Sequence, residues 1–256
     1  MLYKKPLRTS VLIILGLFLS ISLAHTENPK SFKIDGVPRI KQLHNYCGPA
    51  CVTAVMQHYG EKTTQEEVGK EVYDPLSSAT NGADMLFYAR QKGYAAYSWN
   101  TSLNDVKKKI AEGVPVIVLQ QNSNEDTSGH YRILTGYDDA AEKFYVMDPY
   151  YDHITELKYS ECQKWSAKMG FWALMIAPAE KDKFQNELDA KNPVVHMDLA
   201  YANYKRKNYD GALAEANMAL DLEPGNRYAV SMVDKIQNAI GAGSKAKADA
   251  PNNDKD

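Results

Sequence analysis

The stretch KQLHNYCGPACVTAVMQHYG, residues 41–60, contains a cysteine, Cys47, at the point where a helix is expected to begin. Apolar residues at helical spacing follow this cysteine, and Gly60 is a good helix stop. Pro49 is compatible with the first turn, because first-turn amides have no partner within the helix. Since the N-terminal end of a helix favours negative charge, the thiol lies where a thiolate is stabilised. The stretch therefore predicts a helix that begins at a reactive cysteine.

The segments after this helix first have the period of helices and then the period of strands. Helical patterns are expected after two capping-box candidates, Thr63 with Glu66 and Thr64 with Glu67, and over 81–93 and 102–113. Strand patterns follow over 114–121, 130–138, 143–149 and 171–177. Helices first and strands later indicate an α+β fold, in which an antiparallel sheet packs against a helical half.

Residues 1–24 have the pattern of a secretory signal peptide. Three basic residues precede an apolar run that ends in the small-residue exit Ser-Leu-Ala. The run is shorter than the roughly 18 apolar residues usual for a membrane span, although an uncleaved anchor is the alternative. Cleavage after Ala24 predicts an exported protein, periplasmic or secreted, with no stable membrane span once the signal is removed.

The charge balance argues against a nucleic-acid partner. The 256-residue chain has 30 Lys and Arg and 32 Asp and Glu, a formal net charge of −2. Removal of residues 1–24, with their three basic side chains, changes this to −5. A chain without a basic surplus has no electrostatic reason to bind nucleic acid or an anionic membrane.

Composition divides the mature chain into three parts. Residues 30–178 hold the α+β pattern described above, and the chain becomes rich in Ala, Lys, Asp and Asn from about residue 180. Residues 193–240 have helical periodicity and predict a small all-α module. Residues 241–256 are small or charged and predict a disordered tail, because they have nothing to bury.

His130 and Asp148 are the candidate partners of Cys47. If the strands that contain them pair as a hairpin with residue numbers summing to 278, the two lie opposite each other. Their side chains would then be about 5 Å apart. Asp148 could fix the tautomer of His130, which takes the proton of the thiol. The side-chain amide of Gln42, with the Cys47 backbone N–H, could donate to an oxyanion on the attacked carbonyl.

Each of these residues also has an ordinary structural explanation. A cysteine at a helix start can be a small core residue, and a strand histidine beside an aspartate can make a structural hydrogen bond. His44, Cys47 and Cys51 could pass for half of a metal site, but no second Cys/His cluster completes a tetrahedral shell. No metal and no other cofactor is therefore expected.

The other two cysteines leave two alternatives. Cys51 lies one helical turn after Cys47, where Cβ atoms are about 5–6 Å apart, against about 3.8 Å in a disulfide. A bond between these two is therefore not expected. In an oxidising compartment Cys51 could pair with Cys162 and leave Cys47 free, and three free thiols are the alternative.

Four segments carry a resemblance to a known family: QLHNYCGPAC, GVPVIV, GHYRILTGYD and VMDPY. They resemble, in order and spacing, the double-glycine leader peptidases of bacteriocin processing and their stand-alone relatives, in the papain-like clan. The resemblance covers about residues 35–178 and implies a papain-like α+β fold and a peptide or protein substrate. It implies that Cys47 is the nucleophile, His130 the general base and acid, Asp148 the residue that orients His130, and Gln42 the oxyanion donor.

The chain departs from the transporter-fused members of that family. Those members usually carry an acidic residue before the cysteine, where this chain has Tyr46, and they act beside an ATP-hydrolysing transporter. The preference for leader peptides is therefore not carried over. A papain-like transpeptidase or acyltransferase and a non-catalytic peptide-binding protein remain the alternatives to a peptidase.

Residues 193–226 resemble a single tetratricopeptide repeat, although His196 replaces its usual tryptophan. The matching residues are Leu199, Ala200, Tyr209, Ala212, Ala219 and Pro224. Because one repeat cannot bury its face alone, it must pack on the peptidase domain or on a protein partner. A plain helical hairpin without a binding role is the alternative.

Overall fold

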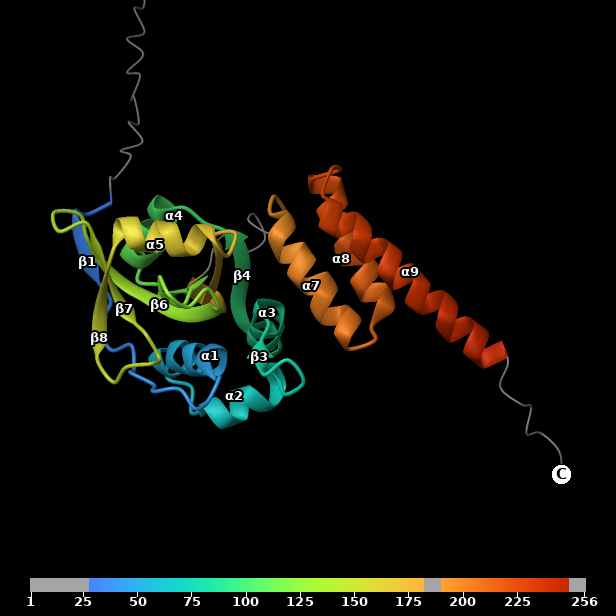
Figure 1. Ribbon diagram of the computed structural model, residues 1–256, viewed down its shortest axis with the longest axis horizontal. Helices are drawn as coiled ribbons and strands as arrows, with labels where there is room; N and C mark the ends of the chain where they lie inside the picture. The colour runs from blue at the N-terminus through green and yellow to red at the C-terminus, as the bar shows by residue number, and fades with distance from the viewer. Residues whose placement is uncertain (1–27, 182–189, 249–256) are drawn as a thin grey trace, which may run out of the picture.

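The computed structural model describes residues 28–181 and 190–248, and shows an antiparallel sheet between two groups of helices, with three further helices beside it (Figure 1). The predicted signal, residues 1–24, and residues 249–256 of the predicted tail lie outside the described residues. The architecture of helices on an antiparallel sheet confirms the α+β prediction.

The main sheet has seven strands in the order β4-β9-β5-β6-β7-β8, with β1 also paired to β6. The four predicted strands are β5, β6, β7 and β9, whereas β1, β4 and β8 were not predicted. The bounds are β1 Ser31–Lys33, β4 Tyr94–Asn100, β5 Val116–Gln121, β6 Gly129–Asp138, β7 Lys143–Met147, β8 Ile154–Lys158 and β9 Trp172–Pro178. A separate two-stranded ribbon is formed by β2 Tyr73–Asp74 and β3 Ala79–Thr80. The short 3-10 helix η1 Ala179–Lys181 follows β9.

Helices cover both faces of the sheet. One group is α1 Cys47–His58, α2 Gln65–Val72 and α3 Gly82–Gln91, and the other is α4 Leu103–Ala111 and α5 Tyr159–Ala167. In Figure 1, α1 lies below the sheet, while α4 and α5 lie above it. The predicted capping box of Thr64 with Glu67 is present, because the Thr64 side chain accepts from the Glu67 N–H and the Glu67 side chain accepts from the Thr64 N–H.

Side chains that alternate along the strands build two separate cores. Ile117 and Ile133 point toward α1, in a cluster that includes Val55. Their neighbours Val116 and Leu134 join the opposite cluster, which contains residues of α4 and α5. This period of two is expected for a sheet that is buried on both faces.

Of the two alternatives for Cys51 and Cys162, the structure has free thiols and not a disulfide. All three cysteines are free thiols, and Cys51 and Cys162 are both buried. Cys51 belongs to the core on the α1 side of the sheet, and Cys162 belongs to the core on the α5 side. The sheet itself therefore separates the two sulfur atoms.

We accordingly expect the denatured, unreduced protein to contain three thiols per chain that react with a colorimetric thiol reagent. Oxidation would first require the core to open, because both buried cysteines lie within packed clusters. A count of one thiol per chain would contradict this separation of Cys51 from Cys162.

The C-terminal module consists of α7 Pro193–Lys205, α8 Tyr209–Leu222 and α9 Arg227–Ala248. Ala200, Ala212 and Ala216 are fully buried where these helices pack together. The predicted tail boundary at residue 241 is wrong, because α9 continues through Ala248. No helix among residues 28–181 and 190–248 is both long and apolar enough to cross a membrane.

Candidate active site

The loop before α1 holds Cys47 in place through a tight turn. The Tyr46 N–H donates to the Leu43 carbonyl at 3.1 Å, and Asn45 has a φ of +59°. Asparagine tolerates this left-handed conformation better than most residues. The Tyr46 ring then lies against Gly69 of α2, where an added Cβ would come within 2.4 Å of the ring. Tyr46 thus anchors the start of α1 on α2.

The segment that carries Gln42 is fixed from two sides. The Gln65 side chain accepts from the Leu43 N–H and donates to the Lys41 carbonyl, both at 2.9 Å. The Gln42 backbone N–H donates to the Pro149 carbonyl at 2.8 Å. These bonds tie Gln42 to the chain segment that immediately follows Asp148.

His130 and Asp148 are in direct contact. His130 Nε2 lies 2.8 Å from Asp148 Oδ1, and both side chains are buried. The predicted pairing sum of 278 is wrong, because Ile133 pairs with Met147 at a sum of 280. Asp148 follows the last residue of β7, so its side chain reaches His130 diagonally. Because Nε2 is used by the carboxylate, Nδ1 is the imidazole nitrogen that remains to accept a proton.

Two residues that the sequence interpretation missed complete the surroundings of this pair. Arg132 Nε donates to Asp148 Oδ2 at 2.8 Å, so the carboxylate is held by two partners. The Tyr150 ring stacks on the His130 ring at 4.5 Å between centroids, and the Tyr150 N–H donates to Asp148 Oδ1 at 3.0 Å. The hydrogen bond to Asp148 therefore fixes the rotation of the imidazole in its plane, and the Tyr150 ring covers one of its faces.

Cys47 lies at the His130 end of β6. The backbone N–H groups of Tyr131, the residue after His130, and of Gly48 act on its sulfur and lower the pKa of the thiol. Burial raises the pKa of the Cys47 thiol above its ordinary value, and these N–H groups only partly counter the rise. The expected stabilisation of the thiolate by the helix start is therefore outweighed, and the resting group is a neutral thiol.

Burial also shapes the ionisation of the other two groups. Desolvation lowers the pKa of His130, although its hydrogen bond to Asp148 acts in the opposite direction. Desolvation would raise the pKa of Asp148, but the hydrogen bond and charge of His130 and the charge of Arg132 bring it to about 2. At neutral pH the site thus holds a neutral imidazole beside an ionised carboxylate.

A small pocket opens beside these groups. It has a volume of about 230 Å³ and is lined by Lys41, Gln42, Leu43, His44, Asn45, Pro149 and Tyr150. Gln42 Oε1 is buried and accepts no hydrogen bond from the described residues. Leaving a buried amide end unpaired is costly, and a bound ligand could satisfy it. The pocket lining includes Gln42 but not Cys47, His130 or Asp148, so the grouping of these four residues around one site stays a prediction.

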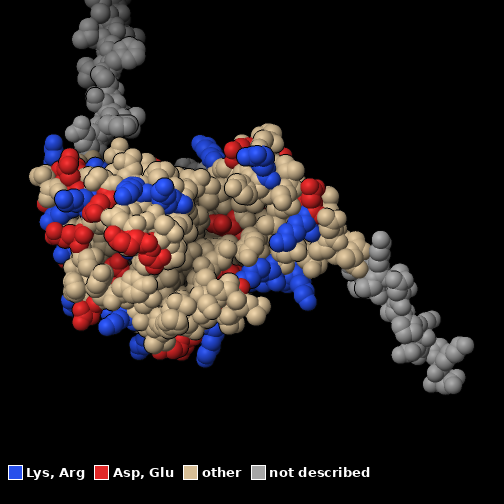
Figure 2. Space-filling model, in the orientation of Figure 1, with Lys and Arg blue, Asp and Glu red and all other residues tan. Residues whose placement is uncertain are grey.

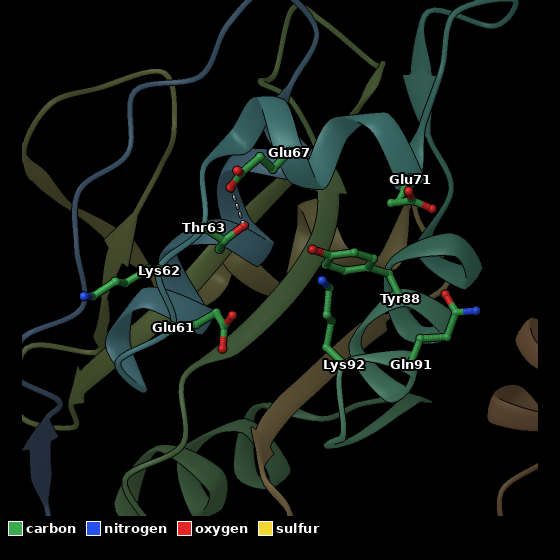
Figure 3. A pocket seen from close by; sticks show the side chains of 8 residues that line it. All are labelled: Glu61, Lys62, Thr63, Glu67, Glu71, Tyr88, Gln91 and Lys92. Carbon is green, nitrogen blue, oxygen red and sulfur yellow. Dashed lines mark hydrogen bonds between the residues drawn. The ribbon is translucent and has the colours of Figure 1, made fainter.

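A larger pocket of about 570 Å³ lies at the other end of α1 (Figure 3). Its lining contains Glu61, Glu67 and Glu71 but no cysteine or histidine. Thr63 donates to Glu67, which is also used in the cap of α2. Within the described part of the chain, no group of three or more His, Cys, Asp or Glu side chains could hold a metal ion.

The face of the described chain shown in Figure 2 carries charges of both signs. On the face shown in Figure 2, Lys and Arg lie among Asp and Glu, with a broad uncharged area between the peripheral charges. Such a face offers no extended basic surface to a phosphate backbone.

The class of the protein follows from a family comparison. The model of the Peptidase C39 like family matches residues 34–175, more than half of the chain. The chain belongs to this family, which indicates a cysteine peptidase. The matched range begins before Gln42 and ends after Asp148, so it contains the whole site described above.

Three solved structures are similar at low sequence identity. A structure described as a C39-like peptidase from Bacillus anthracis has 15% identity and a TM-score of 0.48, and the match covers 57% of this chain and 97% of that chain. A double glycine motif protease from an AMS/PCAT transporter, in complex with the leader peptide, has 18% identity and a TM-score of 0.45, with coverages of 57% and 94%. The peptidase domain of Streptococcus ComA, a bi-functional ABC transporter involved in a quorum-sensing pathway, has 18% identity and a TM-score of 0.44, with coverages of 56% and 99%. No curated protein matches the chain.

Proposed function

We propose that the protein is an exported cysteine peptidase in which Cys47, His130, Asp148 and Gln42 carry the chemistry. The observation that supports this most strongly is the buried contact between His130 Nε2 and Asp148 Oδ1 at 2.8 Å. It leaves Nδ1 free of the carboxylate, and the proposed proton donor, Cys47, is acted on by the backbone N–H of Tyr131, the residue after His130. A neutral imidazole with a free nitrogen is the form that a general base requires.

The first half of the reaction forms an acyl-enzyme. His130 takes the Cys47 proton at Nδ1 as the sulfur attacks the carbonyl carbon of the scissile peptide bond. The negative charge that develops on the carbonyl oxygen is stabilised by the Gln42 side chain and the Cys47 backbone N–H. The C–N bond then breaks, and the leaving amine takes the proton from His130, so a thioester remains on Cys47.

The second half of the reaction releases the product. A water molecule gives a proton to His130 and attacks the thioester carbonyl, and the sulfur leaves with that proton. Asp148 keeps the imidazole in one tautomer and stabilises its protonated form in both halves. An amine in place of water would give transpeptidation through the same acyl-enzyme.

Replacing Gln42 with alanine separates the oxyanion role from activation of the thiol. Because Gln42 acts on the carbonyl oxygen, we expect Gln42→Ala to lower turnover by about 10²- to 10³-fold. Alkylation of Cys47 by iodoacetamide involves no oxyanion and is expected to stay nearly unchanged. A Gln42→Ala variant with full turnover would remove Gln42 from the proposed machinery.

The pH dependence of cleavage reports the protonation of His130. The base must be neutral, and burial lowers its pKa from 6.5, so activity should persist below that pH. The acidic midpoint of kcat/KM is therefore expected below pH 6.5, with activity lost as pH falls through it. A midpoint clearly above 6.5 would contradict a buried neutral His130 as the base.

Export is supported by the signal-peptide pattern of residues 1–24 and bears on the substrate. A periplasmic or secreted peptidase would meet exported peptides and proteins. The function can be tested by incubating a mixture of exported proteins with the purified mature enzyme and sequencing new peptide termini by mass spectrometry. Termini that appear with the wild type but not with Cys47→Ala are expected, and equal termini with both proteins would refute the proposal.

The C-terminal helices are proposed to act as a tetratricopeptide-type module for a protein partner. In support, small alanines bring α7 and α8 close together, as this type of repeat requires. Apolar side chains also remain exposed on the outer helices, with Met218 47% and Tyr228 83% exposed. Exposed apolar surface of this kind is typical of contact regions.

A further inference from the structure

The C-terminal module is joined to the peptidase domain by its first helix. Figure 1 shows α7 beside α3 and β4, with α8 and α9 farther out. Val195 and Leu199 of α7 are buried within the same core cluster as Cys51 and Tyr131. Helix α7 therefore completes the core that also supports the start of α1.

Two carboxylates fix this contact from opposite sides. Asp84 of α3 is buried and accepts from Lys205 Nζ at 2.7 Å and from Arg206 Nη1 at 3.1 Å. Asp198 of α7 reaches in the other direction, and its Oδ2 accepts from Ser98 Oγ at 2.5 Å and from Trp172 Nε1 at 2.9 Å. The middle and the C-terminal end of α7 are thus held by polar groups of the peptidase domain.

Burial raises the pKa of Asp198 to about 6, even though the hydrogen bonds from Ser98 and Trp172 lower it. A carboxylate is costly to desolvate, and an apolar residue in the same place would avoid this cost. The carboxylate instead gives the Trp172 indole an acceptor with a defined direction, which an apolar residue could not supply.

From Trp172 the contact continues toward the catalytic cysteine. The indole lies over Gly82, where an added Cβ would come within 2.3 Å of a ring atom. It meets the Tyr131 ring edge-to-face, with 5.8 Å between centroids. The Tyr131 hydroxyl donates to the Thr80 carbonyl at 3.3 Å, so this tyrosine is held at both its ring and its hydroxyl.

Tyr131 in turn belongs to the core cluster against which Cys47 packs. Its backbone N–H acts on the Cys47 sulfur and lowers the pKa of a thiol whose pKa burial raises. Thr80 lies against Gly48, the residue after Cys47, where an added Cβ would come within 2.7 Å of it. Asp198 is thus linked to the start of α1 through Trp172, Tyr131 and the contact of Thr80 with Gly48.

We propose that Asp198 is a positioning residue for Cys47, which makes helix α7 part of the catalytic unit. Asp198 holds the Trp172 indole against Tyr131, and Tyr131 presents its N–H to the sulfur. The inference rests on the proposed role of Cys47 as nucleophile. It predicts that disturbing α7 at Asp198 changes the chemistry at Cys47 without changing substrate binding.

The test uses the full mature chain and compares Asp198→Ala with Asp198→Asn. Both donors bind the same oxygen, so the carboxamide oxygen of asparagine can replace it. We expect Asp198→Ala to lower kcat about 10-fold with KM unchanged, because a small misplacement of reacting groups is costly. The rate of Cys47 alkylation by iodoacetamide should fall in parallel, and Asp198→Asn should restore both to within about twofold.

The matched control is Glu215→Gln, which removes the carboxylate charge from the contact between His196 Nδ1 and Glu215 Oε2 at 2.7 Å within the helical module. It is expected to leave kcat and alkylation unchanged. If Asp198→Ala does not fold, Trp172→Phe removes the same hydrogen bond from the other side and should slow alkylation similarly. The double variant of Asp198→Asn with Trp172→Phe should then lose no more than Trp172→Phe alone.

Two results would overturn the inference. The first is alkylation and kcat at wild-type level in Asp198→Ala, or in Trp172→Phe where Asp198→Ala does not fold. The second is a loss of kcat and alkylation rate in Glu215→Gln as large as in Asp198→Ala. The alkylation rate needs no substrate and so separates this inference from the peptidase proposal. A wild type that cleaves nothing, yet shows Asp198-dependent alkylation, would refute the peptidase proposal and support the positioning role.

Discussion

Replacing Cys47 with alanine is expected to lower kcat/KM for peptide cleavage by about 10⁴-fold or more. Removal of the nucleophile leaves only binding and oxyanion stabilisation, which retain a small part of the rate enhancement. The side chain is only partly buried, so the variant should fold like the wild type. Cleavage of a fluorogenic peptide, chosen from the identified termini, measures the effect.

Cys51→Ala is the matched control, because Cys51 lies on the same helix one turn later and is fully buried in the core. Alanine fits a helix interior well, so this variant should keep its activity with only a modest loss of stability. A Cys47→Ala variant with more than about a tenth of wild-type activity would show that another group is the nucleophile.

Asp148→Ala is expected to reduce stability as well as activity. Arg132 is 5% exposed and would be left without its carboxylate, and breaking a buried pair in this way costs about 3–5 kcal/mol. His130 would lose its orienting partner at the same time. Urea denaturation of the variant should show a clearly lower free energy of unfolding, and cleavage should fall by orders of magnitude.

The same prediction has a pH signature. The Asp148 pKa is about 2 in the folded protein and about 3.9 in an unfolded chain, so its contribution to stability is present above the higher value. That contribution is lost as pH falls through about 2, and Asp148→Ala should flatten this part of the stability curve. Asp152→Ala removes an exposed carboxylate nearby and should change neither the free energy of unfolding nor the rate of cleavage. Wild-type stability in Asp148→Ala would contradict the described contact with Arg132.

The contact between His130 and Asp148 could be anticipated because each residue lies near the end of one strand of the same hairpin. The register could not, since the turn sets a pairing sum of 281 at Asp138 and Lys143, and an irregularity between Leu134 and Gly136 changes it to 280. Such a shift has no clear signature in a run of apolar residues. Two strands joined by a short turn can thus be predicted as neighbours even where their register is not.

Arg132 did leave a signal in the sequence that the interpretation did not use. A charge in the middle of a strongly apolar strand must be paired when it is buried, and the nearest acid across the hairpin is Asp148. Tyr150 left no such signal, because its stacking on His130 depends on the path of the chain after Pro149. The burial of Asp198 could not be predicted either, since a polar residue on a helix is usually exposed.

The sequence did not reveal that Cys51 and Cys162 are too far separated to form a disulfide, and the reason is physical. Spacing along the chain does not reveal which face of the sheet a helix covers, and α1 and α5 cover opposite faces. The pKa of Cys47 was misjudged for a related reason. The helix start favours a thiolate, but the depth at which the thiol is buried is a tertiary property that no local pattern contains.

The most direct test of the central claim is the pH dependence of Cys47 alkylation by iodoacetamide in the wild type and in His130→Ala. Peptide mapping by mass spectrometry assigns the label to Cys47 and excludes the buried Cys51 and Cys162. If His130 accepts the thiol proton, wild-type Cys47 should react at pH 7 about 10-fold faster or more than in His130→Ala. In that variant the reaction should appear only at alkaline pH, because burial raises the thiol pKa. Identical profiles in the two proteins would show that His130 does not activate Cys47, and the catalytic account would fail.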